Sequence, residues 1–184
     1  MNWIIIDTAF LEALTTDFIA NFGRMLNRPL GPADLCRWLD CLLLDAGVEE
    51  GEHANFVALI HPKTSKTLKT YVPSNFQEEL NDKAFKDRLG EFTLSSYPVE
   101  DLTNTSDFIT ESLRAALEDT KTTRILLVAD VAAYGDTLVK VMDKEVPGKS
   151  VYFFTMQPLP PGPYHQPVLG YSVMNALGIR GEEL

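Results

Sequence analysis

Apolar runs just long enough for one buried strand alternate along this chain with segments of helical periodicity. Continuous apolar runs are typical of strands covered on both faces, and helices between them supply the crossovers that parallel neighbours need. The alternation therefore predicts a mostly parallel central sheet with helices on both faces. We expect an α/β fold in the form of a three-layer sandwich. Residues 1–184 should make a single domain, because neither a linker nor an internal repeat divides them.

The expected elements follow from these patterns and from capping residues. Strands are expected at residues 2–7, 56–60, 92–97, 124–130 and 151–155. Helices are expected at residues 10–22, 32–46, 74–89, 106–117 and 136–147, where apolar residues recur three or four positions apart. In the third helix Ser74 and Gln77 have the spacing of a capping box. In the fifth, Asp136 is the expected N-cap, after a loop at residues 131–135.

The remaining segments leave alternatives open. Residues 68–72 are expected to fold back as a hairpin arm, and the nearby Lys63, Lys66 and Lys69 either protect a solvated edge or contact phosphate. Residues 157–167 contain too many prolines for a helix or a central strand. They either pack as an irregular extended segment or present a polyproline surface to a protein partner. Residues 168–177 are apolar, but their pattern predicts no particular element.

Charge and composition exclude several classes of function. The net charge of -10 disfavours sequence-independent binding of nucleic acid, although a metal ion or a local basic patch could recruit a phosphate. No apolar run approaches the ~20 residues that span a bilayer, so no membrane association is expected. Without a signal-peptide pattern, and with Cys36 and Cys41 placed as free thiols, the expected location is the cytoplasm. The oligomeric state stays open.

Acidic residues follow the expected strands at the positions where open α/β sheets bind ligands. Asp7 ends the first strand, Asp130 ends the fourth, and Asp107 starts the helix after the third. Carboxylates gathered at one edge repel one another, and Mg²⁺ or Mn²⁺ is the usual solution. Each aspartate also has a simpler role as a helix cap or a turn residue. Of the three histidines, all expected at the surface, His61 alone lies near this edge.

These acids, in this order, resemble the PIN-like superfamily, in particular its NYN branch of ribonucleases. The resemblance runs over residues 2–156 and rests on Ile4-Ile5-Ile6-Asp7, Ser106-Asp107-Phe108 and Leu127-Val128-Ala129-Asp130. It implies a metal site of Asp7, Asp107 and Asp130, with Glu111 and Asp136 as weaker ligands. Two family features are missing. The family commonly has an asparagine a few residues after the first aspartate, where this chain has Thr8 to Leu11, and Ala132 replaces a second aspartate after Asp130.

Two functions from different classes therefore remain. The first is a ribonuclease in which Asp7, Asp107 and Asp130 are catalytic, bind Mg²⁺ or Mn²⁺ and act on RNA through the metal. The second is a non-catalytic protein-interaction module on the same fold, in which the acids are only caps and turn residues. Phosphate-loop, dinucleotide-binding and Gly-x-Ser-x-Gly motifs are all missing, which disfavours nucleotide-dependent enzymes and α/β-hydrolases.

Overall fold

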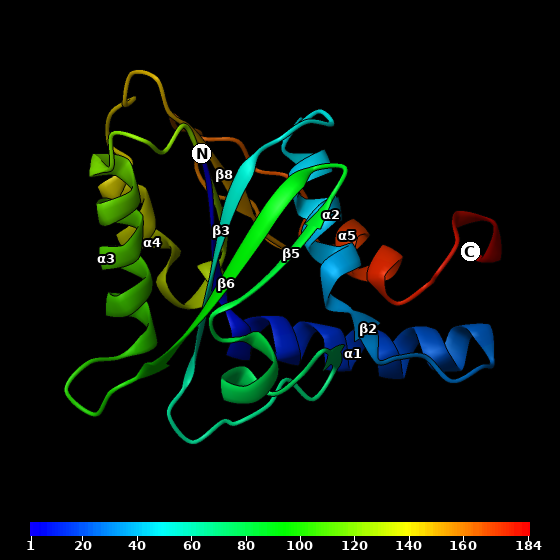
Figure 1. Cartoon of the computed structure of the whole chain (residues 1–184). Coiled ribbons are helices and arrows are strands. Elements are labelled where there is room, and N and C mark those ends of the chain that lie inside the picture. The colour runs from blue at the N-terminus through cyan, green and yellow to red at the C-terminus, as the bar shows by residue number, and fades with distance from the viewer.

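A six-stranded sheet forms the centre of the computed structural model, which describes residues 1–184 (Figure 1). The strands lie in the order β5-β6-β3-β1-β7-β8, and every neighbouring pair is parallel except β5 with β6. Their bounds are β1 Asn2–Asp7, β3 Ala54–Pro62, β5 Lys83–Asp87, β6 Gly90–Val99, β7 Arg124–Val128 and β8 Ser150–Phe154. The predicted α/β fold with a mostly parallel sheet is confirmed.

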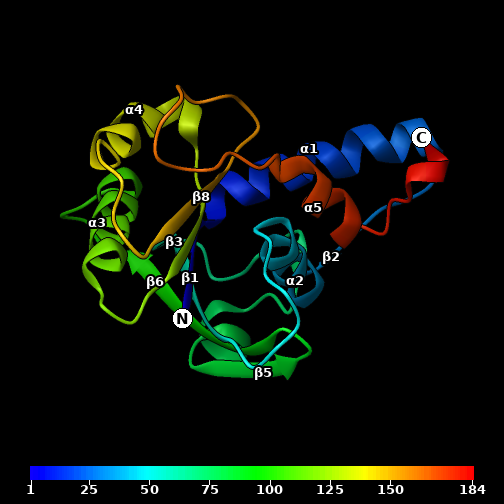
Figure 2. The same ribbon diagram turned by 90° about the horizontal axis from the view of Figure 1, so that it is seen from above.

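Helices cover both faces of the sheet and complete the three layers. Figure 2 shows α3 (Thr105–Glu118) and α4 (Val131–Val141) on one face, and α1 (Thr8–Leu26), α2 (Leu35–Asp45) and α5 (Leu169–Ala176) on the other. Side chains alternate between two cores along β1, because successive strand residues point to opposite faces. Ile4 and Ile6 belong to the core on the α1 side, while Ile5 belongs to the core under α3 and α4. Among the helices, none combines the length and apolar character that crossing a lipid bilayer requires.

The segment predicted as the third helix differs most from its prediction. Only a short π-helix, η1 (Phe76–Leu80), forms there, and Asn75 rather than Ser74 caps it. Asp82 then adopts a left-handed backbone with φ 59°, and the chain continues as β5. The ring of Phe85 stacks on that of Phe92 in β6 at 4.5 Å between centroids. Pairing with β6 therefore overrides a local pattern that also fits a helix.

The predicted hairpin arm is also wrong. Tyr71–Val72 forms β4, which pairs in parallel with β2 (Ala33–Asp34) in a separate two-stranded sheet. Tyr71 is buried, and its hydroxyl lies 3.0 Å from Oγ1 of Thr15 on α1. The Glu12 carboxylate accepts from the backbone N–H groups of Lys69 and Thr70. These bonds hold the segment against α1, so it cannot fold back on β3.

Three helices begin at residues other than the predicted ones. Asp34 caps α2, because Ala33 and Asp34 are extended and pair with β4, so the helix can begin only after them. Asn104 caps α3, so that Asp107 lies in the first turn and not at its start. Asp130 caps α4, which places Asp136 within the helix and replaces the predicted loop with helical turns.

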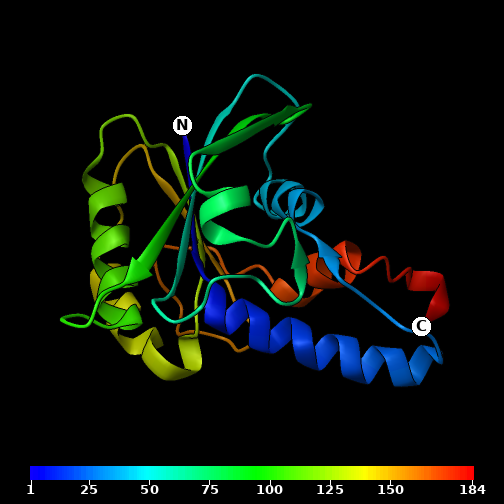
Figure 3. The same cartoon turned by 60° about the horizontal axis from the view of Figure 1, so that its bottom comes forward.

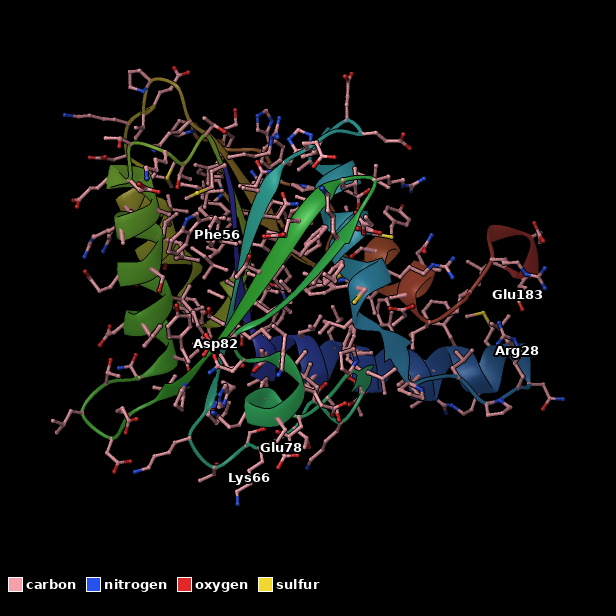
Figure 4. All side chains as sticks on the ribbon, in the orientation of Figure 1. Arg28, Phe56, Lys66, Glu78, Asp82 and Glu183 are labelled. Carbon is pink, nitrogen blue, oxygen red and sulfur yellow. The ribbon has the colours of Figure 1, made fainter.

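The C-terminal part of the chain covers the free edge of the sheet. Within the proline-rich segment, His165 exchanges backbone hydrogen bonds with Val151 and Phe153 of β8, as expected for a packed extended segment. The unassigned residues that follow form α5, where Ser172 accepts from Trp38 Nε1 at 3.0 Å. The chain ends in η2 (Gly181–Glu183), and Glu183 forms a two-bond ion pair with Arg28 at the end of α1 (Figure 4).

Candidate functional site

A pocket opens where the order of the parallel strands reverses. The chain passes from β1 outward through β3 to β6 and then returns to β7 on the other side of β1. As a result α1 leaves β1 toward one face and α4 leaves β7 toward the other (Figure 3). Such a reversal leaves a crevice beyond the carboxyl ends of the two strands, where open α/β sheets bind their ligands. The crevice here has a volume of about 630 Å³, and Asp7, Asp107 and Asp130 all line it.

Asp7 is the most deeply placed of the three acids, with 4% of its surface exposed. Its Oδ1 accepts from the Phe10 backbone N–H at 3.2 Å, and its Oδ2 accepts from the Tyr134 hydroxyl at 2.7 Å. Burial raises the pKa of the Asp7 carboxyl above its usual range, and the charge of Asp130 adds to the rise. The two hydrogen bonds oppose this rise in pKa but do not cancel it. A buried, partly compensated carboxylate therefore lies at the floor of the crevice.

Tyr134 is the site residue that the sequence analysis missed. Its hydroxyl donates to Asp7 and lies 3.4 Å from the Asp130 backbone nitrogen, so it links the loops after β1 and β7. Tyr134 also has non-helical dihedral angles, φ -141° and ψ 22°, which kink α4 at this position. Burial, followed by the nearby charge of Asp7, raises the pKa of the Tyr134 phenol, so the hydroxyl keeps its proton. Its spacing of four residues from Asp130 was the available signal.

Asp130 and Asp107 are less constrained than Asp7. Oδ1 of Asp130 accepts from the Ala133 backbone N–H at 3.2 Å, as an N-cap does. Oδ2 of Asp107 accepts from the Asn104 side-chain amide at 3.1 Å, and the Asp107 residue is exposed. None of the three aspartates forms an ion pair, and no lysine or arginine lines the crevice.

The structure does not bring the two weaker ligands into the crevice. Glu111 is exposed on α3 and forms an ion pair with Arg114 at 2.5 Å. It lines a separate shallow pocket, which it shares with Asp107 and Phe108. Asp136 is exposed on α4 and does not line the crevice.

Comparison with known proteins gives a family but no function. A family model described as a family of unknown function (DUF6621) matches residues 1–184. The chain belongs to the DUF6621 family. A search of the curated proteins and a search of the solved structures found no match. The chemistry of this DUF6621 chain therefore has to be argued from its own side chains.

The acids of the DUF6621 crevice do not fit a divalent metal as they lie. No group of three His, Cys, Asp or Glu side chains in the structure is placed to hold a metal ion. Mg²⁺ needs oxygens that converge at ~2.0–2.1 Å in near-octahedral geometry. Both Asp7 oxygens are already hydrogen-bonded, and the other two carboxylates each use one oxygen within their own helix termini. No reaction step through a metal follows from this arrangement.

Proposed function

We propose that this chain is a non-catalytic PIN/NYN-like binding domain whose crevice receives a cationic side chain of a protein partner. The observation that carries the proposal is the set of three carboxylates that share one crevice without an ion pair and without a metal-ligand arrangement.

The crevice has an unbalanced negative charge. Its lining includes Asp7, Asp107 and Asp130 and no basic residue, in a chain of net charge -10. The raised pKa of Asp7 is partly caused by the charge of Asp130, which means that a negative charge in the crevice disfavours the ionised form of Asp7. A cation between the two carboxylates would reverse this effect, so binding of a cation is favoured at neutral pH.

An organic cation fits this arrangement better than a metal ion does. A guanidinium group carries five N–H donors in a planar fork, and an ammonium group carries three donors on a flexible stem. Such donors can reach carboxylates that lie apart, whereas a small metal ion needs all of its ligands at one point. The crevice therefore suits an arginine or lysine side chain.

The surroundings of the crevice favour a protein as the source of this cation. An acidic crevice repels the phosphates of RNA when no metal ion lies between them. Leu102 is fully exposed two residues before Asn104, which lines the crevice. Tyr97 in β6 is also exposed, and its ring lies 5.9 Å from that of Phe108, the residue after Asp107. Exposed apolar side chains beside a charged cleft are typical of surfaces that bind proteins.

The test is a titration of the isotope-labelled protein with N-acetyl-arginine amide and N-acetyl-lysine amide, followed by amide chemical shifts. We expect saturable shifts at residues that line the crevice, with loss of saturation in the double variant Asp107→Asn, Asp130→Asn. The double variant Asp136→Asn, Asp143→Asn is the matched control, because it removes the same two charges from exposed positions outside the crevice. N-acetyl-glutamine amide should produce no saturable shift. Equal responses to the neutral and cationic compounds would refute the proposal.

A metal-dependent ribonuclease is the second candidate, and one observation favours it. The three acids of the family resemblance, which come from distant parts of the chain, line a single crevice. Calorimetric titration with Mn²⁺ separates the two candidates. Saturable binding that is lost in Asp130→Asn and kept in Asp136→Asn would replace the first proposal with this one, and RNA cleavage would then be assayed. The first proposal predicts no saturable Mn²⁺ binding in any of these proteins.

A further inference from the structure

A second polar pocket lies at the carboxyl ends of β3 and β6, on the far side of β1 from β7. It has a volume of about 330 Å³, and its lining includes His61, Lys63, Ser65, Lys66, Asn75 and Ser96. It shares no residue with the acidic crevice. This second pocket is described below as the His61 pocket.

His61 is the buried polar group of this pocket. The prediction of a surface histidine is wrong here, since only 7% of His61 is exposed. Its ring stacks face to face on Phe76, with 3.9 Å between centroids and 4° between planes. Nδ1 lies 2.9 Å from the Pro62 carbonyl oxygen, and because a carbonyl can only accept, Nδ1 carries the proton. Nε2 makes no hydrogen bond with any protein group, although the stacking on Phe76 and the Nδ1 hydrogen bond hold the ring in place.

The charged groups around this ring give the pocket a positive bias. Lys66 is exposed and forms no ion pair, while Lys63 forms a solvent-exposed ion pair with Asp101 at 3.0 Å. Glu78 is the one acidic residue of the lining, and it is exposed (Figure 4 labels it together with Lys66 at this end of the molecule). The lining thus contains two lysines and one glutamate, and Lys66 is the lysine that no carboxylate pairs, in a chain whose acids outnumber its basic residues by 26 to 16.

Uncharged donors complete the lining. Asn75 uses its side-chain oxygen to cap η1, which leaves its amide N–H groups without a protein partner. Amide N–H donors beside lysine ammonium groups are suited to the recognition of an oxyanion.

We propose that the His61 pocket binds a phosphate group, either as inorganic phosphate or as the monoester of a small molecule. Phosphate suits both protonation states of the ring, whereas sulfate, chloride and carboxylate ions carry no proton to donate at neutral pH. A protonated Nε2 donates to a P–O⁻ oxygen, and a neutral Nε2 accepts from the P–OH of the monoanion. The volume lies at the lower end of the range for small-molecule sites, ~300–1,000 Å³, which fits a phosphate with few additional atoms. This proposal does not depend on the acidic crevice.

The test is calorimetric titration with inorganic phosphate at constant ionic strength, together with a parallel titration with a nucleoside 5′-monophosphate. We expect saturable binding of phosphate to the wild type and its loss in His61→Gln. In Lys66→Gln the affinity should fall by about tenfold, as expected for the loss of one charge-assisted hydrogen bond. Lys140→Gln is the matched control, because Lys140 is an exposed lysine on α4 outside the pocket. This variant should bind phosphate as tightly as the wild type does.

Lys66→Gln keeps the test valid even if His61→Gln unfolds, because the Lys66 side chain is exposed and has no protein partner. Tighter binding of the nucleotide than of phosphate would identify an ester as the ligand, whereas equal or weaker binding would identify free phosphate. The proposal is overturned if millimolar phosphate gives no saturable heat, or if Lys66→Gln binds as tightly as Lys140→Gln.

Discussion

The hydrogen bond between Tyr134 and Asp7 makes a prediction whose size and pH dependence can both be worked out. Tyr134→Phe removes the donor that lies 2.7 Å from Oδ2 of Asp7 and leaves that oxygen without a hydrogen bond from the protein. Hydrogen bonds to charged groups contribute about 1.5–3 kcal/mol. Because Asp7 is only 4% exposed, solvent cannot replace the lost donor. We therefore expect the free energy of unfolding at neutral pH to fall by about 2 kcal/mol.

The sign of the pH dependence follows from the direction of the pKa shift. The folded-state pKa of Asp7 is raised above the ordinary value of 3.8, so the folded protein holds this proton more tightly than the unfolded chain. The contribution of Asp7 to stability is therefore most favourable at acid pH and falls as the pH rises through the folded-state pKa. Loss of the Tyr134 donor raises that pKa further. The difference between Tyr134→Phe and the wild type should thus be largest at neutral pH and shrink toward pH 3.8.

Urea denaturation at several pH values measures this difference. Tyr152→Phe is the matched control, because the Tyr152 ring stacks on His165 while its hydroxyl makes no hydrogen bond in the structure. The double variant Asp7→Asn, Tyr134→Phe should show a smaller penalty for the loss of the hydroxyl than the single variant does. A Tyr134→Phe penalty below about 0.5 kcal/mol, or one that does not change with pH, would refute the reasoning.

Three further predictions concern stability elsewhere in the molecule. Burial, together with the neighbouring Asp87, raises the pKa of Asp40 to about 7, so the free energy of unfolding should fall as the pH rises toward 7. Urea denaturation from pH 5 to pH 9 should show this fall in the wild type and a flatter dependence in Asp40→Asn. Ser172→Ala leaves the buried Trp38 N–H without its 3.0 Å acceptor and should lower the free energy of unfolding by about 1–3 kcal/mol, whereas an unchanged midpoint in urea would show that water replaces the serine. Gly90→Ala should prevent folding, because φ is 103° and a Cβ atom there would lie 2.1 Å from the backbone oxygen of His53. Circular dichroism measures this, and a cooperative thermal transition at the wild-type temperature would contradict the prediction.

The fold was predictable from the sequence wherever a strand is buried on both faces of the sheet, because such a strand consists of a continuous run of apolar residues. The strands at residues 2–7 and 124–130 were recognised in this way, although the second ends at Val128 in the structure. β5 could not be recognised, because Phe76 and Leu80, and likewise Phe85 and Leu89, lie four residues apart, as neighbours on one face of a helix do. What decides its structure is distant in the sequence, since Lys83–Asp87 pairs with β6 and Asp82 adopts a left-handed backbone.

The site was predictable in part for the same physical reason. Asp7 and Asp130 follow central strands, so sequence position alone places them at one edge of the sheet. The position of Asp107 depends on the sheet order, because the chain that leaves β6 must pass β3 before the first turn of α3 can reach the crevice beside β1. Tyr134 was missed because α4 was predicted to begin at Asp136, which placed Tyr134 in a loop where its side chain has no predictable direction. In the structure Asp130 is the N-cap, and a residue four positions after an N-cap lies on the same side of the helix as the cap.

Helix capping and ligand binding do not exclude each other at these aspartates. A capping carboxylate uses one oxygen, and Asp130 uses only Oδ1 in this way. Asp107 uses only Oδ2, whereas both oxygens of Asp7 are occupied. The crevice thus contains one aspartate that is held in place by hydrogen bonds and two that each keep an oxygen for a ligand. This division explains how the same residues can stabilise the starts of α1 and α4 and still give the crevice a charge that attracts a cation.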